Sequence, residues 1–380
     1  MRIAFDLRRI KNPGIGRYMK CLAEAILTQA PQHEYLLILP PGAEDTVAVE
    51  GRHAERLVSS IPYYSVREQI GLPWILRRHK VDMLHSPHFN LPLVRPCSTV
   101  VTIHDVIYLA CRDDMPSRAG RVYYHGMMAA SVRLADRILT DSEFSKSDIV
   151  RFLNTDPEKI EVVYPGVDSR FRPVVNRAVI EPVLSRYRVD EDYILYTGIY
   201  KRRKNHAGLL HAFREFTRNG YRAKLVIAGP IEEGELELRR LAVDLGIAEK
   251  TTIFTGHVPD SDLPALYSGS RLYACPSLYE GFGFTVLEAM ACGVPVVCST
   301  ATSLPEVAGD AALYADPQKP REFADALGRA FTNDDLRKQL IDNGFKNCAR
   351  FSWESAARNT LAAYHHAAGL PTEKEKAVCV

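Results

Sequence analysis

Short apolar runs alternate with longer segments of helical periodicity along the whole chain. The runs in the first half are RIAFDL, EYLLILP, VDMLHSP, STVVTIHD, ADRILTDS and IEVVYPGV. Those in the second half are YILYTGI, AKLVIAG, TTIFTGH, RLYACPS, VPVVCST and AALYADP. Apolar strands separated by helix-length segments are typical of βα units, so the pattern predicts an α/β protein with parallel sheets covered on both faces.

One segment breaks this rhythm with three prolines and many charges, which places an interdomain linker at about residues 168–190. A chain of 380 residues is also longer than one core comfortably fills. We therefore expect two doubly wound, Rossmann-like domains, at residues 1–172 and 173–355. The stretch WESAARNTLAAYHHAA has helical spacing and predicts a last helix over residues 356–370, followed by a flexible tail at 371–380.

Composition narrows the possible functions. With 46% hydrophobic and 25% charged residues the chain reads as globular, and a net charge of +2 is too small to suggest nucleic-acid binding. Eight cysteines lie scattered without metal-ligand spacing, and no apolar run approaches the ~20 residues of a membrane span. These features favour a cytoplasmic protein, one that could visit a membrane only from one side.

Ligands of open α/β sheets bind beyond the carboxyl ends of the strands, so the loops after the apolar runs are candidate sites. Gly14 and Gly16 follow the first run and precede a helix, where backbone amides can approach an anion. The alternative is a glycine turn that only connects strand to helix. The third glycine of the dinucleotide-binding fingerprint is missing.

A second candidate is the stretch YEGFGFTVLEAMACG, which carries Glu280 and Glu288 around the start of a predicted helix that ends at Gly293. Backbone N–H groups from about Phe284 to Leu287 would face an anion such as a diphosphate. Two carboxylates on either side of a diphosphate suit a nucleotide sugar. Alternatively, Glu280 caps the helix and Glu288 is solvated.

These residues carry a family resemblance. The stretch EGFGFTVLEAMACGVPVV resembles the E-x7-E element of retaining glycosyltransferases of the GT-B fold, family four. GIGRY, HSPHF, TIHD, GIYKRRKN and SLPEVAGDAALYADP resemble other loops of that family in the same order, and FSWESAARNTLAAY its final helix. The resemblance covers nearly all of the chain up to about residue 366. It implies an N-terminal acceptor domain, a C-terminal nucleotide-sugar domain, and a last helix that packs back on the N-terminal domain.

The resemblance also implies roles for individual residues. Glu280 would face the donor sugar, Lys204 would neutralise the leaving diphosphate, and His104 would line the sugar pocket. Donor-binding roles are implied for Gly14, Gly16, Arg203, Phe282, Gly283, Phe284, Thr285, Leu287 and Glu288, with Glu288 on the ribose hydroxyls. Taken alone, residues 201–204 could be a solvated charged run and His104 a structural histidine.

The chain departs from the family at Ile199, where many relatives carry arginine, so the second phosphate-binding cation could be Lys201, Arg202 or Arg203. Asp260 and Asp262 have the D-x-D spacing that binds manganese in the other glycosyltransferase fold. Here they precede a predicted helix, so we expect Asp262 to act as its cap and no metal or other cofactor to be needed.

The implied reaction is transfer of a hexose from a nucleotide diphosphate sugar to a saccharide or polyprenyl-linked saccharide, with retention. The loops most resemble relatives that use GDP-mannose in polysaccharide assembly, and UDP-glucose stays open as a donor. A glycoside hydrolase also uses two carboxylates, so hydrolysis stays open as well. The same residues are compatible with a nucleotide-sugar epimerase or with a sensor that binds nucleotide sugar without catalysis.

Residues 65–80, SVREQIGLPWILRRHK, combine apolar residues with a basic end, within a basic excess that spans residues 51–80 and includes Arg52. The pattern suits a segment lying on an anionic membrane, although Pro73 should limit how much of it is one helix. The alternative is an ordinary segment that faces the core.

Overall fold

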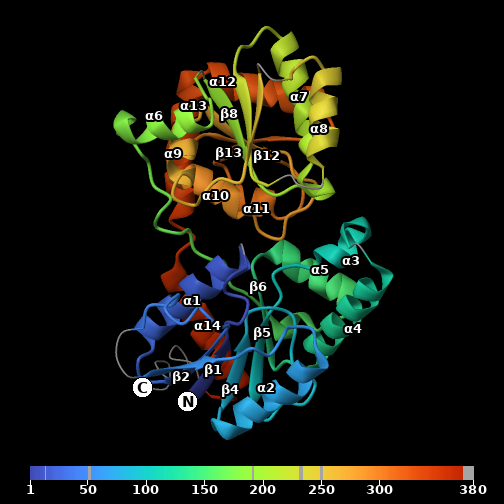
Figure 1. The fold of residues 1–380 in the computed structure, drawn as a ribbon, viewed down its shortest axis with the longest axis vertical. Helices are drawn as coiled ribbons and strands as arrows, with labels where there is room; N and C mark the ends of the chain where they lie inside the picture. Colours follow the sequence, from blue (N-terminus) through green and yellow to red (C-terminus); the bar gives the residue numbers. More distant parts are fainter. Residues whose placement is uncertain are drawn as a thin grey trace. The chain divides into compact units, whose positions relative to one another are not determined.

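A computed structural model describes residues 1–12, 14–49, 53–115, 117–190, 192–230, 234–248 and 251–370. Arg52 and the tail predicted for residues 371–380 lie outside these ranges. The chain forms two compact units, one of residues 1–166 with 351–380 and one of residues 167–350 (Figure 1). The boundaries predicted from sequence were 172/173 and 355/356.

Unit 1 is built on a parallel sheet of seven strands in the order β3-β2-β1-β4-β5-β6-β7. The strands are β1 Arg2–Asp6, β2 Glu34–Leu39, β3 Ala54–Val58, β4 Met83–Ser86, β5 Ser98–Thr102, β6 Arg137–Thr140 and β7 Ile160–Val162. The chain runs outward in one direction from β1 and in the other from β4. The topological switch point of this sheet therefore lies between β1 and β4, where ligands of doubly wound folds bind.

Helices cover both faces of this sheet. They are α1 Ile15–Gln29, α2 Val66–Arg78, α3 Ile107–Ala110, α4 Arg118–Leu134, α5 Glu143–Leu153 and α14 Trp353–Ala367, with 3₁₀ turns η1 Arg112–Asp114 and η2 Pro157–Lys159. Leu22 and Ile26 of α1 share one core with Tyr364 of α14, and α2, α4 and α5 contribute to a second core. The last helix thus belongs to the N-terminal unit, as predicted.

Unit 2 repeats the plan with six parallel strands in the order β10-β9-β8-β11-β12-β13. They are β8 Tyr193–Thr197, β9 Lys224–Ala228, β10 Thr252–Gly256, β11 Leu272–Cys275, β12 Val296–Ser299 and β13 Ala312–Ala315. The switch point lies between β8 and β11. Two Rossmann-like α/β domains, as the apolar runs predict, are confirmed.

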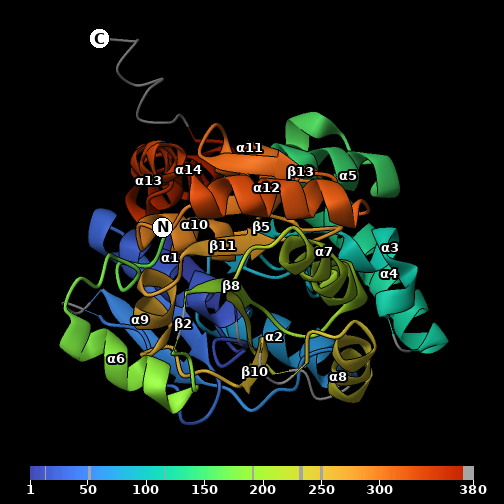
Figure 2. The ribbon, with the colours of Figure 1, turned by 90° about the horizontal axis from the view of Figure 1, so that it is seen from above.

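The helices of unit 2 lie on the two faces of its sheet. They are α6 Arg177–Arg186, α7 His206–Arg218, α8 Glu235–Asp244, α9 Leu263–Ser268, α10 Phe284–Ala291, α11 Leu304–Ala308, α12 Pro320–Thr332 and α13 Asp334–Cys348, with a 3₁₀ turn η3 Arg202–Lys204. Helices α7, α8 and α12 share one core with the sheet. Figure 2 shows α7, α8 and α12 from above. Helix α10 packs against β11, β12 and α13.

Two elements differ from the sequence-based prediction. Strand β3 was not predicted, because its residues are mostly exposed and lack an apolar run. The segment 168–190 is not only a linker, since it contains helix α6 with Pro182 inside it. Ile180 and Val183 of this helix pack on Ala265 of α9. This burial stabilises a helix that the local sequence does not predict.

Helix α2 runs unbroken through Pro73, which corrects the expectation that proline would limit it. Its apolar residues divide between two sides. Ile75 and Leu76 enter the core, whereas Val66, Ile70 and Trp74 are 78%, 70% and 58% exposed. Within the described ranges, no helix combines the length and the apolar character needed to cross a membrane.

Candidate active site

Two loops flank the switch point of unit 2, residues 198–205 after β8 and residues 276–283 after β11. They bring together two residues singled out in the sequence. The Lys204 Nζ lies 2.7 Å from the Glu280 Oε1, and their side chains are only 16% and 11% exposed. The Ser277 hydroxyl donates to the same carboxylate oxygen at 2.6 Å. A cation and a carboxylate therefore meet where a doubly wound sheet binds ligands.

Asn205 fixes the position of Lys204. It adopts a left-handed backbone conformation with a φ of 57° and begins α7, whose Gly208 N–H it caps. Its Nδ2 donates to the carbonyls of Pro276 at 3.1 Å and Pro317 at 2.8 Å. The loops after β8, β11 and β13 are thus joined through one side chain.

The main chain around Glu280 is held from the other side by the segment after β12. The Glu280 N–H donates to the Thr302 hydroxyl at 3.0 Å. The Ser303 hydroxyl bonds the carbonyls of Glu280 and Phe282, each at 2.9 Å. Asn205, Thr302 and Ser303 were not predicted as supporting residues, although all three follow predicted strands at the same edge.

Helix α10 begins at Phe284, directly after Gly283. The φ of Gly283 is 117°, a backbone conformation that residues with a side chain rarely adopt. Phe284 and Thr285 of its first turn are both half-buried. The Val286 N–H already donates to the Gly283 carbonyl at 3.0 Å, so the set of amides that could face an anion is narrower than predicted. Leu287 is 1% exposed, so its side chain belongs to the core.

The second glutamate is buried instead of solvated. Glu288 is 6% exposed and accepts a hydrogen bond from the Tyr267 hydroxyl at 3.1 Å. Burial and the charge of Glu288 hold the pKa of Tyr267 well above its usual range, so this hydroxyl stays protonated as a donor. Helix α10 has no side-chain cap, which also excludes the alternative that Glu280 caps it.

The basic loop beside Lys204 presents its residues unequally. Arg202 is exposed, whereas Lys201 and Arg203 are half-buried. The Arg203 carbonyl accepts from the Leu278 N–H at 2.7 Å, which ties the basic loop to the loop that carries Glu280. The run 201–204 is therefore only partly the solvated surface that its composition alone would suggest.

The two aspartates with D-x-D spacing bind arginines. Asp260 accepts from Arg170 at 2.7 Å. Asp262 accepts from Arg186 and, at 3.0 Å, from the Tyr187 hydroxyl. Asp262 occupies the N-cap position of α9, as predicted, but its side chain makes no capping hydrogen bond with the helix backbone. The Asp262 carboxylate instead binds the last residue of α6 and the tyrosine that follows it. Helix α6 was not predicted from the sequence.

In unit 1, His104 follows β5 and its two ring nitrogens both face oxygen atoms. The Nδ1 lies 2.7 Å from Asp141 Oδ2, and the Nε2 lies 3.3 Å from the Pro87 carbonyl. Burial opposes a charged ring, but the charge and hydrogen bond of Asp141 prevail and raise the pKa of His104 above its usual value. Since both acceptors need a donor, the geometry suits the protonated ring.

The two glycines of the first loop differ in their surroundings. Gly14 has a φ of 75° and open space around the position of a Cβ. A Cβ on Gly16 would lie 2.0 Å from the Ile10 carbonyl oxygen, so close packing requires glycine there. Gly14 has room to approach a ligand, whereas packing alone accounts for Gly16.

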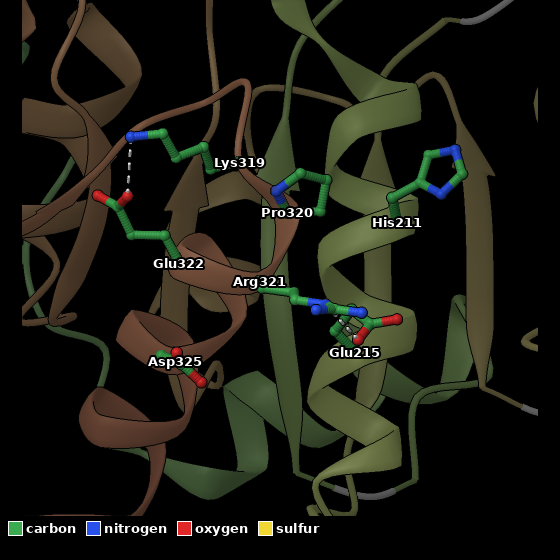
Figure 3. Close-up of a pocket in the computed structure, with 7 residues that line it drawn as sticks. All are labelled: His211, Glu215, Lys319, Pro320, Arg321, Glu322 and Asp325. Carbon is green, nitrogen blue, oxygen red and sulfur yellow. Dashed lines mark ion pairs between the residues drawn. The ribbon is translucent and has the colours of Figure 1, made fainter.

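A cavity of about 630 Å³ lies elsewhere in unit 2, between α7 and α12 (Figure 3). Its lining residues are His211, Glu215, Lys319, Pro320, Arg321, Glu322 and Asp325. Ion pairs join Lys319 to Glu322 at 3.5 Å and Arg321 to Glu215 at 3.6 Å. These charged groups pair with one another, and none of the residues predicted for the site lines this cavity.

Comparison with known proteins finds related sequences along most of the chain. Residues 185–347 match the family described as glycosyl transferases group 1, and residues 14–171 match glycosyltransferase family 4. The chain is 34% identical to O-antigen chain mannosyltransferase B of Escherichia coli, over 96% of this chain and 99% of that protein.

Solved structures show the same fold at low identity. Sucrose-phosphate synthase from Thermosynechococcus elongatus matches with a TM-score of 0.74 and 20% identity, over 96% of this chain and 98% of that one. Anabaena HepE, solved in complex with UDP-glucose, matches with a TM-score of 0.74 and 17% identity, over 96% and 100% of the two chains. Their arrangement of two α/β domains is the GT-B fold.

Proposed function

Because the chain belongs to the group 1 and family 4 glycosyltransferases, we propose that it transfers mannose from GDP-mannose to a saccharide or polyprenyl-linked saccharide, with retention and without a metal ion. The name of the mannosyltransferase from Escherichia coli supports the sugar and the polysaccharide product. The observation that carries the proposal is the pair of Lys204 and Glu280 at the switch point of unit 2.

In the proposed reaction, the bond from the anomeric carbon to the diphosphate breaks first. Negative charge develops on the leaving diphosphate, where Lys204, Arg203 and the first amides of α10 would stabilise it. Positive charge develops on the sugar, where the Glu280 carboxylate would offset it. The acceptor oxygen bonds to the anomeric carbon on the face that the diphosphate leaves, and the acceptor proton passes to a phosphate oxygen.

The two glutamates would serve different parts of the donor. Glu288 lies beyond the first turn of α10, buried and bonded to Tyr267, which suits a fixed acceptor for the ribose hydroxyls. Metal independence is supported by the cations at the switch point, which can replace a metal in stabilising the leaving group. Arginines also compensate both carboxylates of the D-x-D pair.

The site is tested first by binding. GDP, UDP and ADP are each titrated over the same concentration range, and a ligand at about 100 times its dissociation constant stabilises the protein by about 2.7 kcal/mol. The proposal expects GDP to bind most tightly and so to raise the melting temperature at the lowest concentration. Tighter binding of UDP would point to a different donor, such as UDP-glucose.

Turnover is tested next, with GDP-mannose and mannose-terminated oligosaccharides in EDTA. The anomeric configuration of the product is read by NMR. Transfer with an α-linked product from the α-linked donor supports the proposal. Free mannose alone would indicate a hydrolase, isomerised donor an epimerase, and tight binding without any product a sensor.

We further propose that the protein works on the cytoplasmic face of a membrane, where α2 would contact anionic lipid. Val66, Ile70 and Trp74 recur every four residues, so they form one exposed apolar stripe. The Arg78 guanidinium lies over the Trp74 ring at 5.2 Å, and Arg77 is exposed beside it. Apolar side chains framed by cations suit the surface of an anionic bilayer.

Flotation with vesicles containing anionic phospholipid tests this contact. Wild-type protein should float with them, and a variant with Arg77, Arg78 and Lys80 replaced by Ala should float much less. Vesicles of neutral phospholipid provide the control. Equal flotation of the two proteins on anionic vesicles would rule out α2 as the membrane contact.

A further inference from the structure

A second group of polar and aromatic side chains gathers at the switch point of unit 1. Arg9 follows β1, His88 follows β4, and Tyr64 comes from the segment between β3 and α2. The Tyr64 hydroxyl lies 2.7 Å from the His88 Nε2 and accepts a hydrogen bond from Arg9. The Arg9 guanidinium also lies 5.3 Å from the centre of the Tyr64 ring.

Tyr64 has an unusual backbone conformation for an aromatic residue. Its φ of 59° lies in the left-handed region, which disfavours a bulky side chain. The Tyr64 N–H donates to Glu68 Oε2 at 2.9 Å. Glu68 is itself fixed by the Arg8 guanidinium at 2.7 Å and by the Asn90 amide. A buried network therefore over-determines the strained position of this ring.

The ring that is held in this way remains accessible. Tyr64 is 42% exposed and Tyr123 beside it is 38% exposed, with their ring centres 5.7 Å apart. Phe89 is stacked on Tyr64 with an interplanar angle of 18°. The Nε of Arg9 is buried without a hydrogen-bond partner among the described residues. An exposed aromatic surface thus stands beside the Arg9 guanidinium, whose unpartnered Nε is itself shielded from solvent.

The cluster also adjoins a predicted catalytic residue. His104 faces the Pro87 carbonyl, and Pro87 directly precedes His88. Burial, with the nearby charges of Arg9 and His104, keeps the pKa of His88 well below its usual range. A neutral His88 can accept a hydrogen bond at Nε2 from Tyr64 or Arg9. The group therefore extends the surface around His104 along the edge of the sheet.

We propose that Tyr64 and Arg9 form the subsite that binds the terminal sugar of the acceptor saccharide. Sugars carry apolar C–H faces that pack on aromatic rings, and hydroxyl oxygens that accept from guanidinium groups. Neighbouring Tyr123 extends the aromatic surface. This inference rests on the proposed transferase function and names the residues of unit 1 that select its acceptor.

Substitution of Tyr64 by Gly tests the subsite, because glycine accepts the left-handed backbone but removes the ring. We expect the KM for a mannose-terminated oligosaccharide to rise about tenfold or more, as when an aromatic anchor is removed from a binding interface. The KM for GDP-mannose should stay near wild type. Tyr64→Phe, which keeps the ring, should retain most of the acceptor affinity.

A matched control relaxes the same backbone strain elsewhere in unit 1. Asn154 has a φ of 49° at the end of α5, and Asn154→Gly should leave both KM values unchanged. An unchanged acceptor KM in Tyr64→Gly, or equal increases in both KM values, would overturn the subsite. So would a large fall in melting temperature shared by Tyr64→Gly and Tyr64→Phe, since that marks a structural role.

Binding measured without donor separates this inference from the proposed function. Methyl α-mannoside should perturb the Tyr64 ring resonances in NMR spectra of the wild-type protein. If wild-type protein transfers mannose but the sugar leaves Tyr64 unperturbed, only the subsite is wrong. If no transfer occurs yet the perturbation is seen, the transferase proposal fails and the sugar-binding subsite stands.

Discussion

Replacement of Glu280 by Gln removes one charge and almost no volume from the candidate active site. In the wild-type protein the carboxylate accepts from Lys204 at 2.7 Å and from Ser277 at 2.6 Å. The Gln amide oxygen can still accept from one of these donors, so the scaffold should persist. The variant therefore separates the charge of Glu280 from its position.

The expected sizes of the two effects differ. A hydrogen bond to a charged group contributes about 1.5–3 kcal/mol, and the retained amide contact should limit the loss of stability to about 1–2 kcal/mol. For a domain of this size that lowers the melting temperature by about 2–8 °C. Loss of charge stabilisation in the transition state should cost about 2.7 kcal/mol or more, which lowers kcat about 100-fold.

Steady-state kinetics with GDP-mannose, calorimetric titration with GDP and thermal unfolding measure these quantities in one preparation. Glu322→Gln is the matched control, because that exposed glutamate pairs with Lys319 in the same unit at 3.5 Å. It should leave kcat unchanged. The assigned role is refuted if Glu280→Gln abolishes GDP binding while kcat with saturating donor stays near wild type.

Four further predictions concern single residues. Glu288→Gln should weaken GDP binding and raise the donor KM about tenfold with little change in kcat, because ribose contacts change little during reaction; unchanged affinity in calorimetry would contradict this. Lys204→Ala should reduce the transition-state stabilisation calculated from kcat/KM by about 3 kcal/mol, while turnover by the wild-type protein should survive EDTA. Activity that is lost in EDTA and restored by manganese would refute the cationic mechanism. Asp141→Asn should destabilise the protein most below about pH 6.5 and progressively less as pH rises through the raised pKa of His104, a trend that melting curves from pH 5.5 to 8.5 would show or refute. Gly16→Ala should cost about 1–3 kcal/mol of stability without changing GDP affinity. A melting temperature of the variant equal to that of the wild-type protein would show that the loop shifts to accommodate the methyl group.

The strands other than β3 could be predicted from sequence because burial on both faces imposes continuous apolar runs. Strand β3 could not, since an edge strand with exposed Glu55 and Arg56 needs no such run. Helix α6 was hidden for a different reason. Its stability comes from packing on α9, which a sequence window around Pro182 does not contain.

The site was predictable to the extent that its residues follow strands. Lys204 and Glu280 are 76 positions apart, yet both lie in loops after strands that are neighbours in a doubly wound sheet. The hydrogen bond from Tyr267 to Glu288 could not be foreseen, because it depends on how α9 and α10 pack. The hydrogen bond from the Glu280 N–H to the Thr302 hydroxyl could not be foreseen either, because the sequence does not show which backbone group this hydroxyl contacts.

The return of α14 to unit 1 constrains how such enzymes can be recombined. A chimera that exchanges everything after one junction near Gly166 would replace unit 2 and would also import a foreign last helix. Its counterparts of Trp353 and Tyr364 would then meet a surface of α1 and β5 to which their shapes are not fitted. Two junctions are needed, near Gly166 and near Phe351, so that the N-terminal parent keeps its own final helix.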